Sequence, residues 1–232
     1  MKRNKCKCQN KIEAKKGITV AFLGVDGTGK STHAEKLSSW FQEHQIKCII
    51  IPFHKWMFAD VLKRRIGKYV DSGRNSDSLR PYTPKKYSLP ALLKPPVALL
   101  DNILMFYYSK WKFKDYDVII FDRFVCATLI KSKALNYHVD WLRPIWQNIK
   151  VDIGLVLDAP IQKSLDTIDD RNNHILYTYE QLTQERNDYL ELARKCGYEV
   201  FDTSKPLESI HGEIKRYLSR ILFLPPSREM IP

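Results

Sequence analysis

Residues 18–32 have the sequence Ile-Thr-Val-Ala-Phe-Leu-Gly-Val-Asp-Gly-Thr-Gly-Lys-Ser-Thr. The first six are apolar or β-branched, which is typical of a strand buried on both faces of a sheet. A glycine-rich turn follows, and beyond it Ala34, Leu37 and Phe41 recur at helical spacing. This stretch therefore predicts a strand, a glycine loop and a helix in immediate succession.

The glycine loop at residues 24–31 matches the pattern G-x-x-x-x-G-K-[ST], and it lies in the strand-to-helix context that this P-loop motif requires. Backbone N–H groups of such a loop wrap a polyphosphate, and the following helix N-terminus adds positive potential. Lys30 is expected to reach the β- and γ-phosphates, and Ser31 to ligate Mg²⁺. The motif predicts binding of ATP and Mg²⁺, and the predicted cofactor-binding residues are Gly24, Asp26, Gly27, Thr28, Gly29, Lys30, Ser31 and Thr32.

The run Val118-Ile-Ile-Phe121 predicts a second buried strand, and Asp122 and Arg123 follow it directly. A P-loop needs a further acidic group near the metal, usually at the end of a neighbouring strand, so Asp122 is the expected partner of Ser31 in metal binding. The Arg123 guanidinium is expected to grip a phosphate in bidentate fashion. An ordinary strand-end carboxylate and a surface ion pair remain the alternatives for these two residues.

Further apolar runs occur at residues 48–52, 153–157 and 199–201, and segments of helical periodicity such as 179–195 separate the runs. This alternation predicts a doubly wound three-layer α/β/α fold with a parallel sheet, the architecture of P-loop NTP hydrolases and kinases. Residues 72–96 hold five prolines among Ser, Arg and Lys, and we expect an irregular inserted loop there.

The formal net charge of +12 is concentrated in two segments of the 232-residue chain. Residues 1–16 hold seven basic residues against one acidic residue, and residues 61–96 hold nine against two. The rest of the chain is close to neutral, so the composition does not indicate a general nucleic-acid-binding surface. Binding of nucleic acid through the basic N-terminal tail stays open.

No run of about 18 apolar residues occurs, and the basic N-terminus is not followed by an apolar signal-peptide core. The five cysteines are scattered, unlike a disulfide framework. These observations predict a cytoplasmic protein without a membrane span.

The P-loop with an acidic third residue, Asp26, and the run Asp122-Arg123-Phe124 together resemble the thymidylate kinases, over roughly residues 17–218. The resemblance implies phosphoryl transfer from ATP to a nucleoside monophosphate, with dTMP favoured, and a homodimer. It places Asp26 near the sugar hydroxyl of the nucleotide and Arg123 at the acceptor phosphate.

The segment Leu104-Met-Phe106-Tyr-Tyr-Ser-Lys110 is similar to a family segment whose aromatic residue stacks on the base. The resemblance implies that Phe106 and Lys110 bind the substrate. Phe53, at the end of the second strand, is also expected to bind the substrate. From the sequence pattern alone, Phe106 is as readily a core residue.

Some members of the family carry an arginine in the P-loop, where this chain has Gly27, and others supply it from a lid. Here the lid arginine should lie between residues 158 and 179, where Lys163 and Arg171 are the basic residues, and we favour Arg171. The predicted catalytic residues are therefore Lys30, Asp122, Arg123 and Arg171. The loop at residues 203–206 is implied to border the adenine.

The domain organisation that follows is a basic tail at 1–16, one kinase domain at 17–222 and a C-terminal tail at 223–232. Within the kinase domain we expect a basic insertion around 61–96 and a short lid around 160–178.

The chain departs from the family pattern after Phe124, where Ala127, Thr128, Lys131 and Ser132 alter the hydrogen-bonding set, and after Pro52, where bases replace an acid. A kinase of the same scaffold for another phosphorylated or hydroxylated acceptor is therefore one alternative. A nucleotide-dependent switch that binds nucleic acid or anionic lipid through the basic segments is the other.

Overall fold

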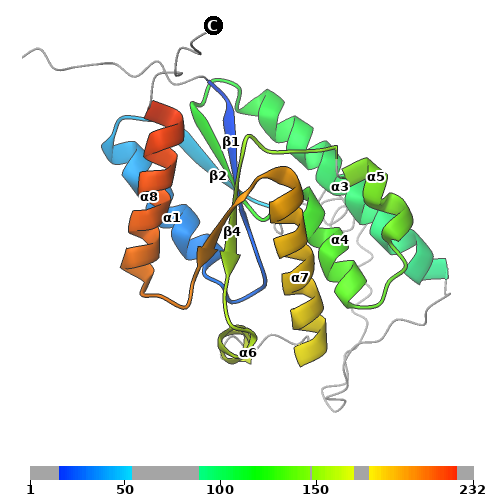
Figure 1. The fold of residues 1–232 in the computed structure, drawn as a ribbon. Coiled ribbons are helices and arrows are strands. Elements are labelled where there is room, and N and C mark those ends of the chain that lie inside the picture. The colour runs from blue at the N-terminus through cyan, green and yellow to red at the C-terminus, as the bar shows by residue number, and fades with distance from the viewer. Residues whose placement is uncertain (1–15, 54–88, 147, 170–177, 224–232) are drawn as a thin grey trace, which may run out of the picture.

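The computed structural model describes residues 16–53, 89–146, 148–169 and 178–223 (Figure 1). Helices and strands alternate along these residues. In chain order they are β1 (Ile18–Leu23), α1 (Lys30–Glu43), β2 (Cys48–Pro52), α3 (Leu89–Lys112), β3 (Val118–Asp122), α4 (Val125–Ala134), the 3₁₀ turn η1 (Asp140–Leu142), α5 (Arg143–Trp146), β4 (Ile153–Asp158), α6 (Ile161–Asp169), α7 (Tyr179–Cys196), β5 (Glu199–Asp202) and α8 (Leu207–Phe223).

The five strands form one parallel sheet in the order β2-β3-β1-β4-β5. Each strand lies where the apolar runs predict it, and the helices from Lys30 and from Tyr179 begin where the sequence places them. Since β1 is central, the loop that follows it emerges between β3 and β4 at the carboxyl edge of the sheet, where ligands of open α/β sheets bind.

Helices cover both faces of the sheet, which confirms the three-layer prediction (Figure 1). Successive residues of β1 alternate between two cores: Val20 and Phe22 pack with α1 and α8, whereas Ala21 and Leu23 pack on the side of α3, α4 and α7. Both faces of β1 are thus buried, as its unbroken apolar sequence requires.

The expectation of an irregular loop throughout residues 72–96 is wrong at its C-terminal end, because α3 begins at Leu89 and contains Pro95 and Pro96. Proline in a helix removes a hydrogen bond and disfavours the helical conformation of the residue before it. Leu99, Met105 and Phe106 bury one side of α3 in the core, and this packing outweighs the local cost. Neither α3 nor another helix of the described ranges is long and apolar enough to cross a membrane.

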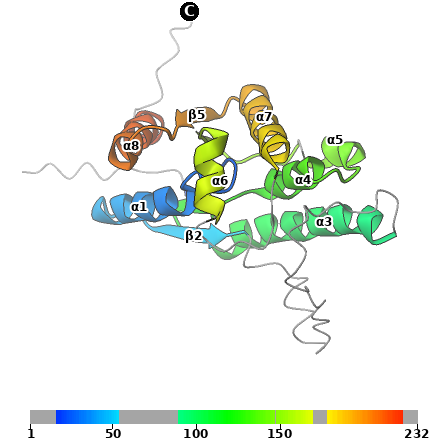
Figure 2. The ribbon, with the colours of Figure 1, turned by 90° about the horizontal axis from the view of Figure 1, so that it is seen from below.

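The first half of the expected lid is helical, since α6 occupies residues 161–169 and lies across the carboxyl edge of the sheet (Figure 2). It packs closely on the P-loop: Gly27 has a φ of 88°, and a Cβ there would lie 2.9 Å from the Ser164 carbonyl oxygen. The second half of the lid, the terminal segments 1–15 and 224–232, and residues 54–88 lie outside the described residues. The domain division therefore stays a prediction.

Two histidines meet between α1 and α8. The rings of His33 and His211 stack with centroids 6.1 Å apart, and neither buried Nδ1 atom has a hydrogen-bond partner among the described residues. Burial, followed by the charge of His211, lowers the pKa of His33 to about 4, and burial also lowers the pKa of His211. Lys36 adds to both shifts and Glu208 opposes them.

We expect this pair to make the fold sensitive to acid. The pKa of His33 is lower in the folded than in the unfolded chain, so the unfolded state binds more protons, and stability is lost as pH falls from about 6.5 towards 4. Urea unfolding at pH 7 and pH 5 should show a smaller loss for His33→Leu than for the unmodified protein. The exposed-histidine control His138→Asn should retain the full loss, and an unchanged pH dependence in His33→Leu would contradict this assignment.

Candidate active site

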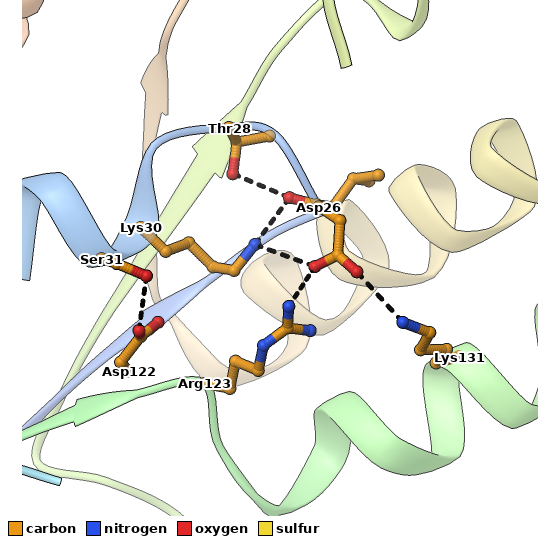
Figure 3. Close-up of polar contacts among 8 residues, drawn as sticks. Asp26, Thr28, Lys30, Ser31, Asp122, Arg123 and Lys131 are labelled. Atoms are coloured by element: carbon orange, nitrogen blue, oxygen red, sulfur yellow. Dashed lines mark hydrogen bonds and ion pairs between the residues drawn. The ribbon is translucent and has the colours of Figure 1, made fainter. Parts of the chain in front are cut away.

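The P-loop is held closed by its own hydrogen bonds. The carbonyl oxygen of Val25 accepts a bond from Thr28 Oγ1 at 2.9 Å and one from Lys30 Nζ at 2.6 Å (Figure 3). Gly24 has a φ of 132°, and a Cβ there would lie 2.3 Å from the Leu157 carbonyl oxygen of β4. The loop can therefore keep its shape only with glycine at this position.

Lys30 lies at the start of α1 and only 5% of its surface is exposed. Its Nζ is 3.6 Å from Asp26 Oδ1, in addition to the bond with Val25. Burial lowers the pKa of Lys30 to about 8, against the opposing attraction of Asp26. The ammonium is thus held beneath the loop, where a P-loop lysine would meet a bound polyphosphate.

The carboxylate of Asp26 forms ion pairs with three cations of the site (Figure 3). Arg123 Nη2 donates to Asp26 Oδ1, and Lys131 Nζ donates to Asp26 Oδ2 at 3.0 Å. Burial by itself would raise the pKa of Asp26, but Lys30, Arg123 and Lys131 together hold it well below its usual range. Asp26 is therefore a carboxylate that only accepts hydrogen bonds.

Arg123 joins β3 to α4 in an unusual backbone conformation. Its φ of 77° lies in the left-handed region, and its N–H donates to the Phe22 carbonyl oxygen at 3.1 Å. Non-glycine residues in this region cost about 1–3 kcal/mol and persist only where the surrounding structure imposes them. The turn aims the guanidinium at the P-loop.

Ser31 and Asp122 are brought together as the sequence predicts. Ser31 Oγ donates to Asp122 Oδ2 at 2.6 Å, and Asp122 is buried at the end of β3. Asp122 Oδ1 is also buried and has no hydrogen-bond partner among the described residues. A hydroxyl beside a carboxylate with an unused oxygen is a donor set that fits Mg²⁺.

The aromatic residues assigned to the substrate lie in the core beneath the site. Phe53 and Phe106 are 4% and 3% exposed, and both pack on the rings of Phe121 and Phe124. Lys110 is exposed and holds its Nζ 5.5 Å from the centroid of the Phe106 ring. The geometry matches the core alternative for Phe106, and contact of these residues with substrate stays a prediction.

Of the two basic residues expected in the lid, Lys163 and Arg171, the structure describes only Lys163. Arg171 lies outside the described residues. Lys163, on α6, donates from Nζ to the Thr203 carbonyl oxygen at 2.6 Å, so it ties α6 to the loop after β5.

The structure brings near Asp26 two charged residues, Lys131 and Glu185, that the sequence pattern does not assign to the site. Lys131 is a departure from the family pattern in the sequence, and Glu185 of α7 belongs to a segment, Glu185–Ala193, that resembles a family segment and is expected to be scaffold. Glu185 lies in the stripe Leu182, Glu185, Tyr189 and Leu192, whose helical spacing marks it as buried. Burial, and then the charge of Asp26, raises the pKa of Glu185 to about 7, and its Oε1 has no hydrogen-bond partner among the described residues.

No protein-family model matches the chain. A protein named probable thymidylate kinase 1, from Saccharolobus solfataricus, is 25% identical over 207 residues, which cover 88% of this chain and 98% of that protein. The chain is thus similar to thymidylate kinases along nearly their whole length. The predicted family resemblance is therefore confirmed.

Solved structures show a similar fold. The thymidylate kinase from Ehrlichia chaffeensis superposes with a TM-score of 0.54 at 16% identity, covering 87% of this chain and 98% of that one. The deoxyadenosine kinase from M. mycoides gives 0.57 at 17% identity, covering 87% and 99%. The predicted P-loop kinase fold is confirmed.

Phe106→Ala distinguishes a core role from a substrate role. Because the ring is buried against Phe121 and Phe124, its removal should lower the free energy of unfolding by about 3–5 kcal/mol. Urea denaturation measures this loss, and Tyr179→Ala, at an exposed aromatic residue, is the control. A stable variant with only a raised KM for the acceptor would show that substrate contact, not packing, is the role of Phe106.

Proposed function

We propose that the chain is an ATP- and Mg²⁺-dependent phosphotransferase that converts dTMP to dTDP. The observation that carries this proposal is the convergence on Asp26 of the P-loop lysine and of Arg123 from the end of β3. Relatives named as thymidylate kinases that match along nearly their whole length support dTMP as the acceptor. An ATP-dependent step in nucleotide synthesis also fits the expected cytoplasmic location.

The donor side of the site is built for a triphosphate. P-loop N–H groups and Lys30 would bind the β- and γ-phosphates, and Ser31 with Asp122 would hold Mg²⁺. When bound, the metal neutralises charge on the phosphate oxygens. The buried Oδ1 of Asp122, which has no hydrogen-bond partner among the described residues, supports this assignment.

On the acceptor side, no nucleophilic side chain is needed, because a phosphate oxygen of dTMP is itself the nucleophile. That oxygen bonds to the γ-phosphorus of ATP as the bond to the β–γ bridging oxygen breaks, which leaves ADP. Arg123 would hold the acceptor phosphate in line, and Arg171 would close over the transferring group. Catalysis then comes from alignment and from charge stabilisation.

The acceptor is tested by coupled ADP release from ATP and Mg²⁺ with dTMP, dUMP, CMP, UMP, GMP, AMP and deoxynucleosides, each compared with an acceptor-free control. We expect turnover with dTMP well above the others. Lys30→Met should lower kcat by two or more orders of magnitude, because the lost ammonium would contact the transferring phosphates. Preferential turnover of a nucleoside or another monophosphate would replace dTMP as the acceptor, and acceptor-independent release would contradict the proposal.

We also propose that the protein is a homodimer joined through α3. One side of α3 carries exposed apolar residues that we call the α3 stripe: Leu92, Leu93, Val97, Leu100, Leu104, Tyr107, Tyr108 and Trp111. Steps of four and three residues from Leu93 to Trp111 are the spacing of helix–helix seams. Together these side chains expose on the order of 900 Å² of surface, and a standard interface buries about 800 Å² of surface per partner.

Leu100→Glu should separate the two copies, since a carboxylate would be buried at the centre of the seam. Light scattering coupled to gel filtration should give twice the 27.2 kDa chain mass for the unmodified protein and the single-chain mass for the variant. Ile221→Glu, at an exposed apolar residue of α8, should remain a dimer. A monomeric unmodified protein at tens of micromolar would overturn the homodimer.

A further inference from the structure

Positive charge is in excess around Asp26. Lys30, Arg123 and Lys131 all interact with its single carboxylate, and all three lower its pKa. Charges that are taken out of water are stable only when they are balanced by opposite charge. Asp26 and Asp122 together supply two carboxylates against these three cations, so a further anion that enters the cluster would meet positive charge.

A third carboxyl group nearby, that of Glu185, offsets this excess only in part. Glu185 is almost completely buried on α7, and burial together with the charge of Asp26 raises its pKa to about 7. Burial thus disfavours the charged form of this carboxyl group. Its buried Oε1 has no hydrogen-bond partner among the described residues.

Of these three cations, Lys30 and Arg123 have roles in the proposed reaction, whereas Lys131 has none. It lies two helical turns beyond Arg123, on α4, and its side chain is 27% exposed, whereas that of Lys30 is 5% exposed. A lysine carries its charge on a flexible four-carbon stem. The ammonium of Lys131 can therefore change partner with much less rearrangement than that of Lys30.

Arg123 and Lys131 hold opposite oxygens of Asp26, so their charged groups flank one small region (Figure 3). With hydrogen bonds of about 3 Å to the two oxygens of one carboxylate, the two nitrogens lie within roughly 8 Å of each other. A phosphate group has three terminal oxygens and can accept bonds from two cations at such a separation.

We propose that Lys131 binds the phosphate of the acceptor nucleotide together with Arg123, and that its ammonium leaves Asp26 Oδ2 when it does so. The freed carboxylate oxygen then accepts a hydrogen bond from a hydroxyl of the acceptor sugar. Binding of the acceptor thus exchanges one ion pair for a phosphate contact and a sugar contact. This inference rests on the proposed nucleoside monophosphate kinase activity.

The test compares a ligand with and without the phosphate. Isothermal titration calorimetry with dTMP and with thymidine gives two dissociation constants for each variant. Lys131→Gln should weaken dTMP binding ten- to hundred-fold and change thymidine binding less than three-fold, because only dTMP carries the group that Lys131 contacts. Lys131→Arg, which keeps the charge, should restore most of the preference for dTMP.

Lys133→Gln is the matched control. Lys133 lies two residues, about half a helical turn, beyond Lys131 on α4, and its side chain is similarly exposed. Its Nζ, however, pairs with Asp188 at 2.7 Å. Lys133 also lines a cavity of about 30 Å³ between α4, α5 and α7. That cavity has room for about one water molecule. The variant should bind dTMP and thymidine as the unmodified protein does, and its KM for ATP should not change.

Equal weakening of dTMP and thymidine by Lys131→Gln would overturn the inference, because it would mean that Lys131 only orders Asp26. Unchanged binding of both would overturn it as well. If Lys131→Gln melts far below the unmodified protein, Lys131→Met, which keeps most of the apolar stem, takes its place. Failure of the proposed function looks different: the unmodified protein itself would neither bind nor phosphorylate dTMP, and the inference would fall with it.

Discussion

The carboxylate of Asp26 holds together the segments that make the site. It lies in the P-loop, and its oxygens bind Arg123 from the end of β3 and Lys131 from α4. Without that carboxylate, three cations would lie close together with one carboxylate fewer to balance them, and their mutual repulsion would favour separation of the loop from α4. The position of Arg123, and therefore the line along which an acceptor could approach the P-loop, depends on this one negative charge.

The sheet supplies the fixed frame for that interaction. Because β1 and β3 are adjacent and parallel, Phe22 lies opposite Asp122, so the P-loop and the Asp122-Arg123 pair leave the sheet side by side. Both strands are buried on both faces, which keeps their ends in place. Ser31 and Asp122 meet without either side chain having to reach far.

Local patterns were sufficient for most of this architecture. The apolar runs and the glycine spacing located every strand, the P-loop and the pair at Asp122 and Arg123, because these signals depend on neighbours in sequence. The start of α3 was missed because prolines are a local signal for irregular structure, whereas the burial of Leu99 and Met105 is a tertiary effect. Lys131 was noticed without a role, since only the fold shows that it reaches Asp26.

The left-handed backbone at Arg123 restricts which residues this position can accept during evolution. Glycine would relieve the strain and asparagine would tolerate it, but neither carries a positive charge. Lysine keeps a charge but not the planar fork that engages two oxygens at once. The backbone conformation and the positive charge thus favour different residues at this position. Arginine supplies the charge but adopts the left-handed conformation with strain. Sequence drift should therefore be slower at Arg123, which is partly exposed, than at the fully buried apolar positions that follow it, where only volume matters.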